Sequence, residues 1–101
     1  MEAHAAAIVL INAFEVLPES DEEFLRGWEA SRDYLRRQPG YIETTLHRSL
    51  SPSAGFRFVN VARWQDANAF RAATGSDEFR RVAAALARFP SHPSLYEVVR
   101  T

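Results

Sequence analysis

Asn60 and Trp64 are the two residues of this chain whose types and spacing most readily support chemistry. They stand four apart in the segment 56–64, where alternating apolar residues predict a β-strand, so both side chains lie on the same face of the predicted sheet. Phe56 and Phe58 share that face. A buried amide without a hydrogen-bond partner costs roughly 1–3 kcal/mol. The pair therefore either lines a cavity and offers hydrogen-bond donors to a ligand, or is a satisfied core asparagine beside a packing tryptophan.

Arg80 is a third candidate, on the last predicted helix. It lies about 100° around the helix axis from the core residue Phe79, so its guanidinium can reach a pocket mouth and place positive charge near an oxyanion. The alternative role is a surface salt bridge. Among the histidines only His47 is placed to accept a proton, and its strand face is expected to be exposed or to face a partner subunit. No His, Asp or Glu cluster has metal-ligand spacing, so we expect no metal.

Composition limits the possible classes of protein. The 101 residues, 47% of them hydrophobic, predict a single domain spanning residues 1–101, with residues 1–6 as a flexible N-terminus. A net charge of −1 without a basic block argues against nucleic acid as a partner. No segment is apolar for long enough to span a membrane, and no secretion signal is evident. We therefore expect a cytoplasmic location.

The first half of the chain predicts a strand, a helix and a second strand. The strand covers residues 8–16 and ends before Pro18. A helix then begins at Ser20, with Glu23 completing a capping box, and it ends before the Pro39-Gly40 pair. The second strand covers residues 41–49.

The second half of the chain completes a ferredoxin-like pattern. A loop over residues 51–55 leads into the strand that carries Asn60 and Trp64. A helix from about Asp66 is interrupted at Gly75 and continues from Ser76 as a helix that buries residues near Phe79, Ala83 and Leu86. Residues 94–100 form the last strand. The fold class is therefore α+β, a βαββαβ antiparallel sheet whose second helix is split.

Two features of these elements point to a pocket and to a homodimer. The strands are apolar on both faces, but helices cover only one face in this fold, so the other face needs a partner. On the covered face, Gly27 and Ser31 are small residues beside the core stripe of the first helix, and Ala83 is small on the last helix. Either the backbones approach closely there or a ligand-sized space remains.

The chain resembles the antibiotic biosynthesis monooxygenase family over nearly its whole length. The resemblance lies in the segment 56–70, in Ser76-Asp77-Glu78-Phe79-Arg80, in the opening segment 11–16, in Pro39-Gly40 and in the closing segment 95–99. It implies a dimeric α+β barrel built from ferredoxin-like subunits. Family members include anthrone oxygenases that work without a cofactor, heme-degrading enzymes, quinol oxygenases and proteins of unassigned activity.

Two branches of the family can be compared with this chain. The cofactor-free anthrone oxygenases carry an Asn, a Trp and an Arg where this chain has Asn60, Trp64 and Arg80, but they have a Tyr where it has Phe70. The heme-degrading branch has an Asn that matches Asn12, whereas alanines replace its Trp and its axial His, the latter at Ala83. The resemblance therefore implies oxidation of a planar hydroxylated aromatic molecule by O2 without a cofactor.

The same pocket would also suit a non-redox cyclase or isomerase, or a binding protein without catalysis. In the oxidative reading, Asn60, Trp64 and Arg80 are the candidate catalytic residues. The residues expected to line the substrate pocket are Asn12, Phe14, Gly27, Trp28, Ser31, Phe58, Phe70 and Ala83.

Overall fold

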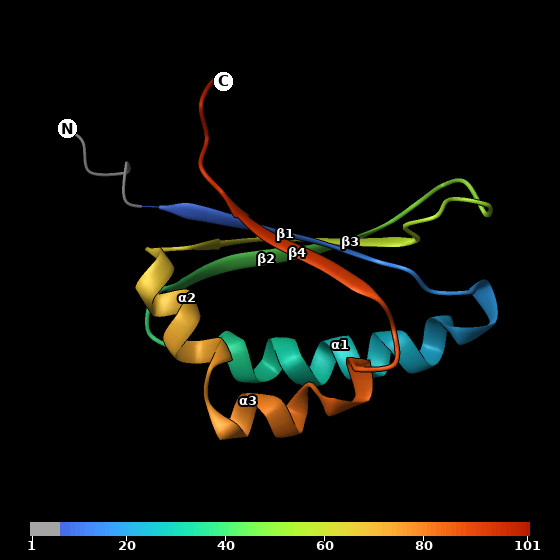
Figure 1. The fold of residues 1–101 in the computed structure, drawn as a ribbon, viewed down its shortest axis with the longest axis horizontal. Coiled ribbons are helices and arrows are strands. Elements are labelled where there is room, and N and C mark those ends of the chain that lie inside the picture. Colours follow the sequence, from blue (N-terminus) through green and yellow to red (C-terminus); the bar gives the residue numbers. More distant parts are fainter. Residues whose placement is uncertain (1–6) are drawn as a thin grey trace.

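A computed structural model describes residues 7–101, and the N-terminal residues 1–6, expected to be flexible, lie outside the described part. Figure 1 shows two layers, an antiparallel sheet and a set of helices packed against one of its faces. In chain order the elements are β1 (Ile8–Phe14), η2 (Pro18–Ser20), α1 (Asp21–Leu35), β2 (Tyr41–Arg48), β3 (Phe58–Trp64), α2 (Ala67–Thr74), α3 (Asp77–Val82), η3 (Ala84–Leu86) and β4 (Ser91–Tyr96). This arrangement confirms the ferredoxin-like α+β prediction, including the split second helix.

The sheet has the strand order β2-β3-β1-β4, with every neighbouring pair antiparallel. The two central strands, β1 and β3, bring Asn12 directly opposite Asn60. Because facing residues in an antiparallel pair point to the same side, both asparagines lie on the face that the helices cover. The strand order therefore places the polar residues of interest at the centre of the sheet.

The strand boundaries differ from the sequence prediction at both ends of the chain. The first strand ends at Phe14 rather than at residue 16, and β4 covers Ser91–Tyr96 rather than residues 94–100. We predicted a turn around Pro93, but the structure places this proline inside β4, opposite Asn12. A proline is tolerated there because β4 is an edge strand, so the missing N–H removes no hydrogen bond from the sheet interior.

Phe56 was expected on the strand of Asn60 but precedes it. The third strand begins at Phe58, and Phe56 is about half exposed, with its ring centroid 5.1 Å from that of His92. The sheet face that carries Asn60 therefore has one aromatic residue fewer than predicted.

The predicted capping box at the start of the first helix is wrong. A short 3-10 helix, η2, precedes α1, and the Ser20 side chain caps no backbone N–H. Its Oγ instead accepts a hydrogen bond from Arg88 at 3.2 Å. The predicted starts of the later helices near Asp66 and at Ser76 are confirmed, and both side chains are caps: Asp66 accepts from Ala69 N at 2.8 Å and Ser76 accepts from Phe79 N at 3.0 Å. The break at Gly75 between α2 and α3 is confirmed.

The core between sheet and helices consists of two clusters. One is aromatic, with Phe24 stacked on Phe58 at a centroid distance of 4.6 Å. The other contains Leu10, Ala62 and Trp64 at the opposite end of the sheet. The helices leave a space between sheet and helix layer that residues of both clusters border. This space is where the site is found.

The other face of the sheet carries no helix (Figure 1). The alternate residues of β1 and β3 point to it. Apart from the exposed Arg63 at its edge, they are apolar and only half-buried: Val9, Ile11, Ala13, Val59 and Val61. We call these five residues the outer apolar face. No helix in the described part of the chain is long and apolar enough to cross a membrane.

Candidate functional site

A cavity of about 260 Å³ lies between the covered face of the sheet and the helix layer. Its volume is close to the lower end of the roughly 300–1,000 Å³ usual for small-molecule sites. The lining is mostly apolar and aromatic, with a few polar side chains, and consists of Leu10, Asn12, Phe14, Trp28, Ser31, Arg32, Leu35, Tyr41, Thr44, Asn60, Ala62, Trp64, Phe70, Thr74, Phe79, Leu86 and Pro93. This composition suits a largely apolar ligand that is oriented by a small number of hydrogen bonds.

The cavity brings together most of the residues that the sequence analysis singled out. Seven of them line it: Asn12, Phe14, Trp28, Ser31, Asn60, Trp64 and Phe70. They come from β1, β3, α1 and α2, segments that are distant in the sequence.

Four of the predicted residues do not border the cavity. Phe58 packs in the aromatic core against Phe24. Gly27 is a close-packing position, because a Cβ there would lie 3.0 Å from Leu86 Cδ2. Ala83 follows α3 and is half-buried outside the lining. At Gly27 and Phe58 the residue type serves close contact between elements rather than leaving open space.

Arg80 is the fourth residue outside the cavity, and its predicted place at the pocket mouth is corrected by the structure. It lies on the exposed side of α3, two-thirds exposed, and forms an ion pair with Asp77 one turn earlier. The angular offset of Arg80 from Phe79 allowed either direction, and α3 turns it to solvent. The alternative of a surface salt bridge therefore describes its contacts.

Asn60 is nine-tenths buried, and its amide is held in one orientation. Its Oδ1 accepts hydrogen bonds from Trp28 Nε1 at 3.2 Å and from Thr44 Oγ1 at 2.8 Å. An indole N–H can only donate, so the atom that it contacts must be the amide oxygen. Among residues 7–101, none accepts a hydrogen bond from the Asn60 NH2 group. The side chain is thus satisfied at its oxygen, while its two N–H donors remain available to a ligand.

Trp64 provides a second buried donor on the same strand. Its side chain is 1% exposed and is clamped between the rings of Tyr41 and Phe70, at centroid distances of 5.5 and 5.7 Å. Both rings contact it edge to face. Within the described part of the chain, no atom accepts a hydrogen bond from Trp64 Nε1. A buried indole without a partner is expected where a ligand supplies the acceptor.

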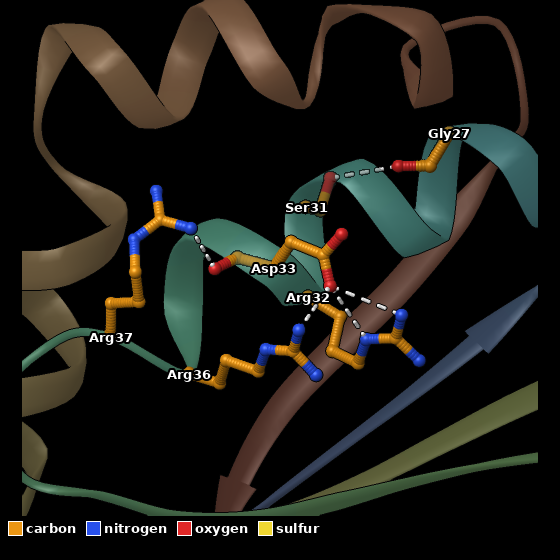
Figure 2. Close-up of polar contacts among 6 residues, drawn as sticks. All are labelled: Gly27, Ser31, Arg32, Asp33, Arg36 and Arg37. Atoms are coloured by element: carbon orange, nitrogen blue, oxygen red, sulfur yellow. Dashed lines mark hydrogen bonds and ion pairs between the residues drawn. The ribbon is translucent and has the colours of Figure 1, made fainter.

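The other predicted polar residues of the cavity are engaged with the backbone. Asn12 Oδ1 accepts from the backbone N–H of His92 at 3.0 Å, which links β1 to β4. Figure 2 shows Ser31 Oγ donating to the carbonyl oxygen of Gly27 one helical turn earlier, at 3.1 Å. The Ser31 hydroxyl therefore uses its donor within the helix, and only its lone pairs face the cavity.

Sequence reasoning missed Tyr41 and Thr44, both on β2. Simple alternation would place residues three apart on opposite faces, yet both line the cavity. The reason is a bulge between Tyr41 and Glu43 that shifts the register by one residue. Burial raises the pKa of the Tyr41 phenol above its usual value, and the nearby charges of Arg32 and Arg36 oppose this effect. Tyr41 therefore faces the cavity as a neutral phenol at neutral pH.

Arg32 was also missed, and it is the one charged residue among the lining side chains. It follows Ser31 on α1 and is partly exposed, which is why the apolar stripe of the helix gave no sign of it. Its guanidinium lies 5.2 Å from the centroid of the Trp28 ring and donates to Asp33 (Figure 2).

Two further side chains that could exchange a proton with a substrate, His47 and Tyr34, are outside the cavity. His47 is exposed on the uncovered face of the sheet, with Nδ1 near the carbonyl oxygen of Val59. Tyr34 is buried, and its hydroxyl pairs with Ser76 Oγ at 2.7 Å. Within residues 7–101, no three His, Cys, Asp or Glu side chains are grouped closely enough to hold a metal ion.

Comparison with known proteins agrees with this fold. Residues 7–85 match the profile of the family described as antibiotic biosynthesis monooxygenase. No curated protein matches the chain by sequence. The solved structure of a candidate monooxygenase from Shewanella loihica PV-4 is 38% identical, with a TM-score of 0.83, covering 95% of this chain and 97% of that one.

A second similar structure is that of SnoaB, a cofactor-independent oxygenase from Streptomyces nogalater. It is 30% identical, with a TM-score of 0.86, and the match covers 96% of this chain and 97% of that chain. A conserved protein from Methanosarcina mazei Go1 is 17% identical with a TM-score of 0.80, which shows the fold alone. The chain belongs to the antibiotic biosynthesis monooxygenase family.

Proposed function

We propose that this protein is a cofactor-independent monooxygenase that oxidises a planar hydroxylated aromatic molecule, such as an anthrone or quinol, with O2 to a quinone. The observation that carries the proposal is the pair of buried, unpartnered donors, the Asn60 amide and the Trp64 indole, in an apolar cavity. Membership of the family and the similarity to a cofactor-independent oxygenase support the same conclusion.

The chemistry needs no electrons from outside the substrate. Loss of a proton converts the aromatic substrate to an anion, which transfers one electron to O2 and leaves a substrate radical beside superoxide. Their recombination forms a carbon–oxygen bond and a peroxide anion. After protonation, the O–O bond breaks, a carbonyl forms and water leaves, so one substrate and one O2 give one quinone and one H2O. Before protonation the reacting pair carries one negative charge throughout: first delocalised over the substrate anion, then on superoxide, and then on the peroxide.

The cavity residues match the needs of these anions. Fixed N–H donors in a site that excludes water stabilise a developing anion more than water does, because they need no reorganisation. The Asn60 NH2 group and Trp64 Nε1–H take this role in our proposal. Tyr41, a phenol whose pKa burial raises further above neutral pH, is the donor that returns a proton to the peroxide. Phe70 carries no such group, and it packs against Trp64 instead.

A homodimer is part of the proposal, with the outer apolar faces of two subunits in contact. Apolar residues near the C-terminus support it: Tyr96, Val98 and Val99 are half or more exposed, and the C-terminal segment runs away from the helix layer (Figure 1). A cytoplasmic location, expected from the sequence, belongs to the same proposal.

Oxygen uptake with an anthrone or a dihydroxynaphthalene tests the function. We expect O2 consumption that depends on the protein and matches the appearance of a quinone absorbance. Conversion without O2 uptake would identify a cyclase or isomerase instead. Binding without conversion of any such substrate would indicate a non-catalytic binding protein.

A further inference from the structure

We propose that Arg32 forms an anion-recognition point at one end of the cavity, so that the ligand is an aromatic molecule bearing an ionised oxygen group, a carboxylate or an acidic phenolate. The inference rests on the proposed function only in taking this ligand to be the substrate. Its basis is the charge, the orientation and the free donors of one side chain.

The charge of the cavity lining is of one sign only, positive. The lining contains no Asp, Glu or His, and Arg32 is its one charged member. The surrounding helix end is also basic, because Arg32 and Arg36 share the Asp33 carboxylate, at 3.1 and 3.3 Å, while Arg37 donates to the Asp33 backbone oxygen at 2.7 Å. Figure 2 shows these three arginines gathered around one aspartate. Three arginines against one aspartate give this end of α1 a net positive charge, and the cavity-lining Arg32 is part of it, which favours an anionic ligand.

The Arg32 guanidinium is also held in place. It lies over the Trp28 ring at 5.2 Å, a distance typical of a cation–π contact. The same ring donates its indole N–H to Asn60 Oδ1. One tryptophan thus links the position of the positive charge to the orientation of the Asn60 amide.

Arg32 has donors left for a ligand. Its Nε and Nη2 both contact the same oxygen, Asp33 Oδ1, at 3.2 and 3.1 Å. Among residues 7–101, Nη1 has no acceptor. The contact with its immediate chain neighbour is a partly exposed ion pair, which contributes little to stability and which a ligand anion can rearrange. The guanidinium of Arg32 therefore binds Asp33 through Nε and Nη2, and its Nη1 can donate to a ligand.

The two tryptophans allow ligand binding to the cavity to be measured directly, without any turnover of a substrate. The chain has two, Trp28 and Trp64, and both line the cavity, so tryptophan fluorescence reports its occupancy. The probes are 2-naphthoate and 2-naphthamide, which have the same ring and nearly the same shape but differ in charge. Calorimetric titration gives the same affinities without an optical signal.

The expected result is a charge preference that depends on Arg32. The wild-type protein should bind naphthoate about tenfold more tightly than naphthamide, the factor expected for a hydrogen bond to a charged group. Arg32→Gln should abolish this preference by weakening naphthoate alone, and Arg32→Lys should keep most of it. The matched control is Arg36→Gln, because Arg36 shares Asp33 but does not line the cavity. It should keep the preference.

Three outcomes would overturn the inference: no naphthoate binding by the wild type, equal affinity for the two probes, or the same loss in Arg36→Gln as in Arg32→Gln. Oxygen uptake is measured separately. A charge preference without any oxygen uptake would reject the proposed function alone, whereas oxygen uptake with equal probe affinities would reject this inference alone.

Discussion

At the scale of single residues, the site depends on how the Asn60 amide is held. Two donors, Trp28 Nε1–H and Thr44 Oγ–H, fix its oxygen, and this leaves the NH2 group as the only end that can serve a ligand. The cost of burying such a group unpaired, roughly 1–3 kcal/mol, is recovered when an anionic oxygen accepts from it. The buried indole N–H of Trp64 likewise gains an acceptor when such a ligand binds.

Removing either donor should slow turnover more than it destabilises the protein. We expect Asn60→Ala and Trp64→Phe each to lower the rate about ten- to a thousandfold, the range for one donor to a developing anion. Trp64→Phe keeps most of the ring between Tyr41 and Phe70, so its thermal midpoint should change little. Steady-state kinetics and thermal unfolding of both variants measure this. Wild-type rates in both variants would show that the pair is only structural.

Tyr41 leads to a prediction about pH. Because burial raises the pKa of Tyr41 above 10.0, the phenol stays a proton donor throughout the neutral range. Tyr41→Phe should therefore lower turnover by about a hundredfold at every pH from roughly 6 to 9, the lower end of the effect of a general acid. The pH–rate profile should otherwise follow the acidity of the free substrate, and Phe70→Tyr should be tolerated.

The raised pKa of Tyr41 also predicts that the free energy of unfolding falls at alkaline pH. The unfolded chain loses the tyrosine proton before the folded chain does, so the contribution of neutral Tyr41 is fully present below pH 10.0 and is lost as pH rises above it. Alkaline unfolding should be less steep in Tyr41→Phe. If an enzyme pKa disappears in a His47 or Tyr34 variant instead, another side chain moves the proton.

At the scale of elements, the turn between α1 and β2 decides where Tyr41 lies. Gly40 has φ = 88°, in the left-handed region that favours glycine, and its carbonyl oxygen accepts from Gln65 N at 2.7 Å. The bulge after Tyr41 then directs both this residue and Thr44 to the covered face. The turn and the bulge together supply two of the polar groups of the cavity.

Gly40→Ala should therefore destabilise the protein. The new Cβ would lie 2.4 Å from the Ala69 Cβ on α2, in addition to the strained backbone conformation. We expect a loss of at least about 1–3 kcal/mol in the free energy of unfolding. Gly55→Ala is the matched control, because a Cβ at Gly55 would have no neighbouring atom within 4 Å and the backbone there is outside the left-handed region. Urea denaturation of both variants measures the difference, and equal stabilities would contradict this account of the turn.

Particular residues show what the sequence could and could not predict. Alternation placed Asn60 and Trp64 correctly on one covered face, because β3 is regular from Phe58 to Trp64. It could not find Tyr41, because a bulge changes the alternation without a clear sequence signal. Helical periodicity did not decide where the Arg80 side chain points. A residue at the edge of the apolar stripe of a helix can point toward the core or toward solvent. Arg32 was missed for the same reason, although α1 turns it toward the cavity rather than away from it.

At the scale of the whole molecule, the uncovered sheet face needs an explanation. The outer apolar face is half-buried in one subunit, and the helices pack only on the other side of the sheet (Figure 1). A monomer of 101 residues buries a modest share of its surface, so a second subunit would add considerable stability.

We predict a homodimer at micromolar concentration. Val61 lies near the centre of the outer apolar face, opposite Ile11, so Val61→Lys should dissociate the dimer by burying a charge at its interface. Asn68→Lys, at an exposed position on α2 in the helix layer, is the control for added charge and should leave the dimer intact. Sedimentation equilibrium measures both variants. A stable wild-type monomer would contradict the prediction.

The fate of the two oxygen atoms of O2 shows whether this protein is a monooxygenase. The protein, treated with a chelator, is given an anthrone and heavy-isotope-labelled O2 in ordinary water, and the quinone is analysed by mass spectrometry. We predict one labelled oxygen atom in each quinone, one O2 consumed per quinone formed, and a much slower reaction in Asn60→Ala. An unlabelled quinone, or label incorporated equally fast by wild-type protein and Asn60→Ala, would contradict this prediction.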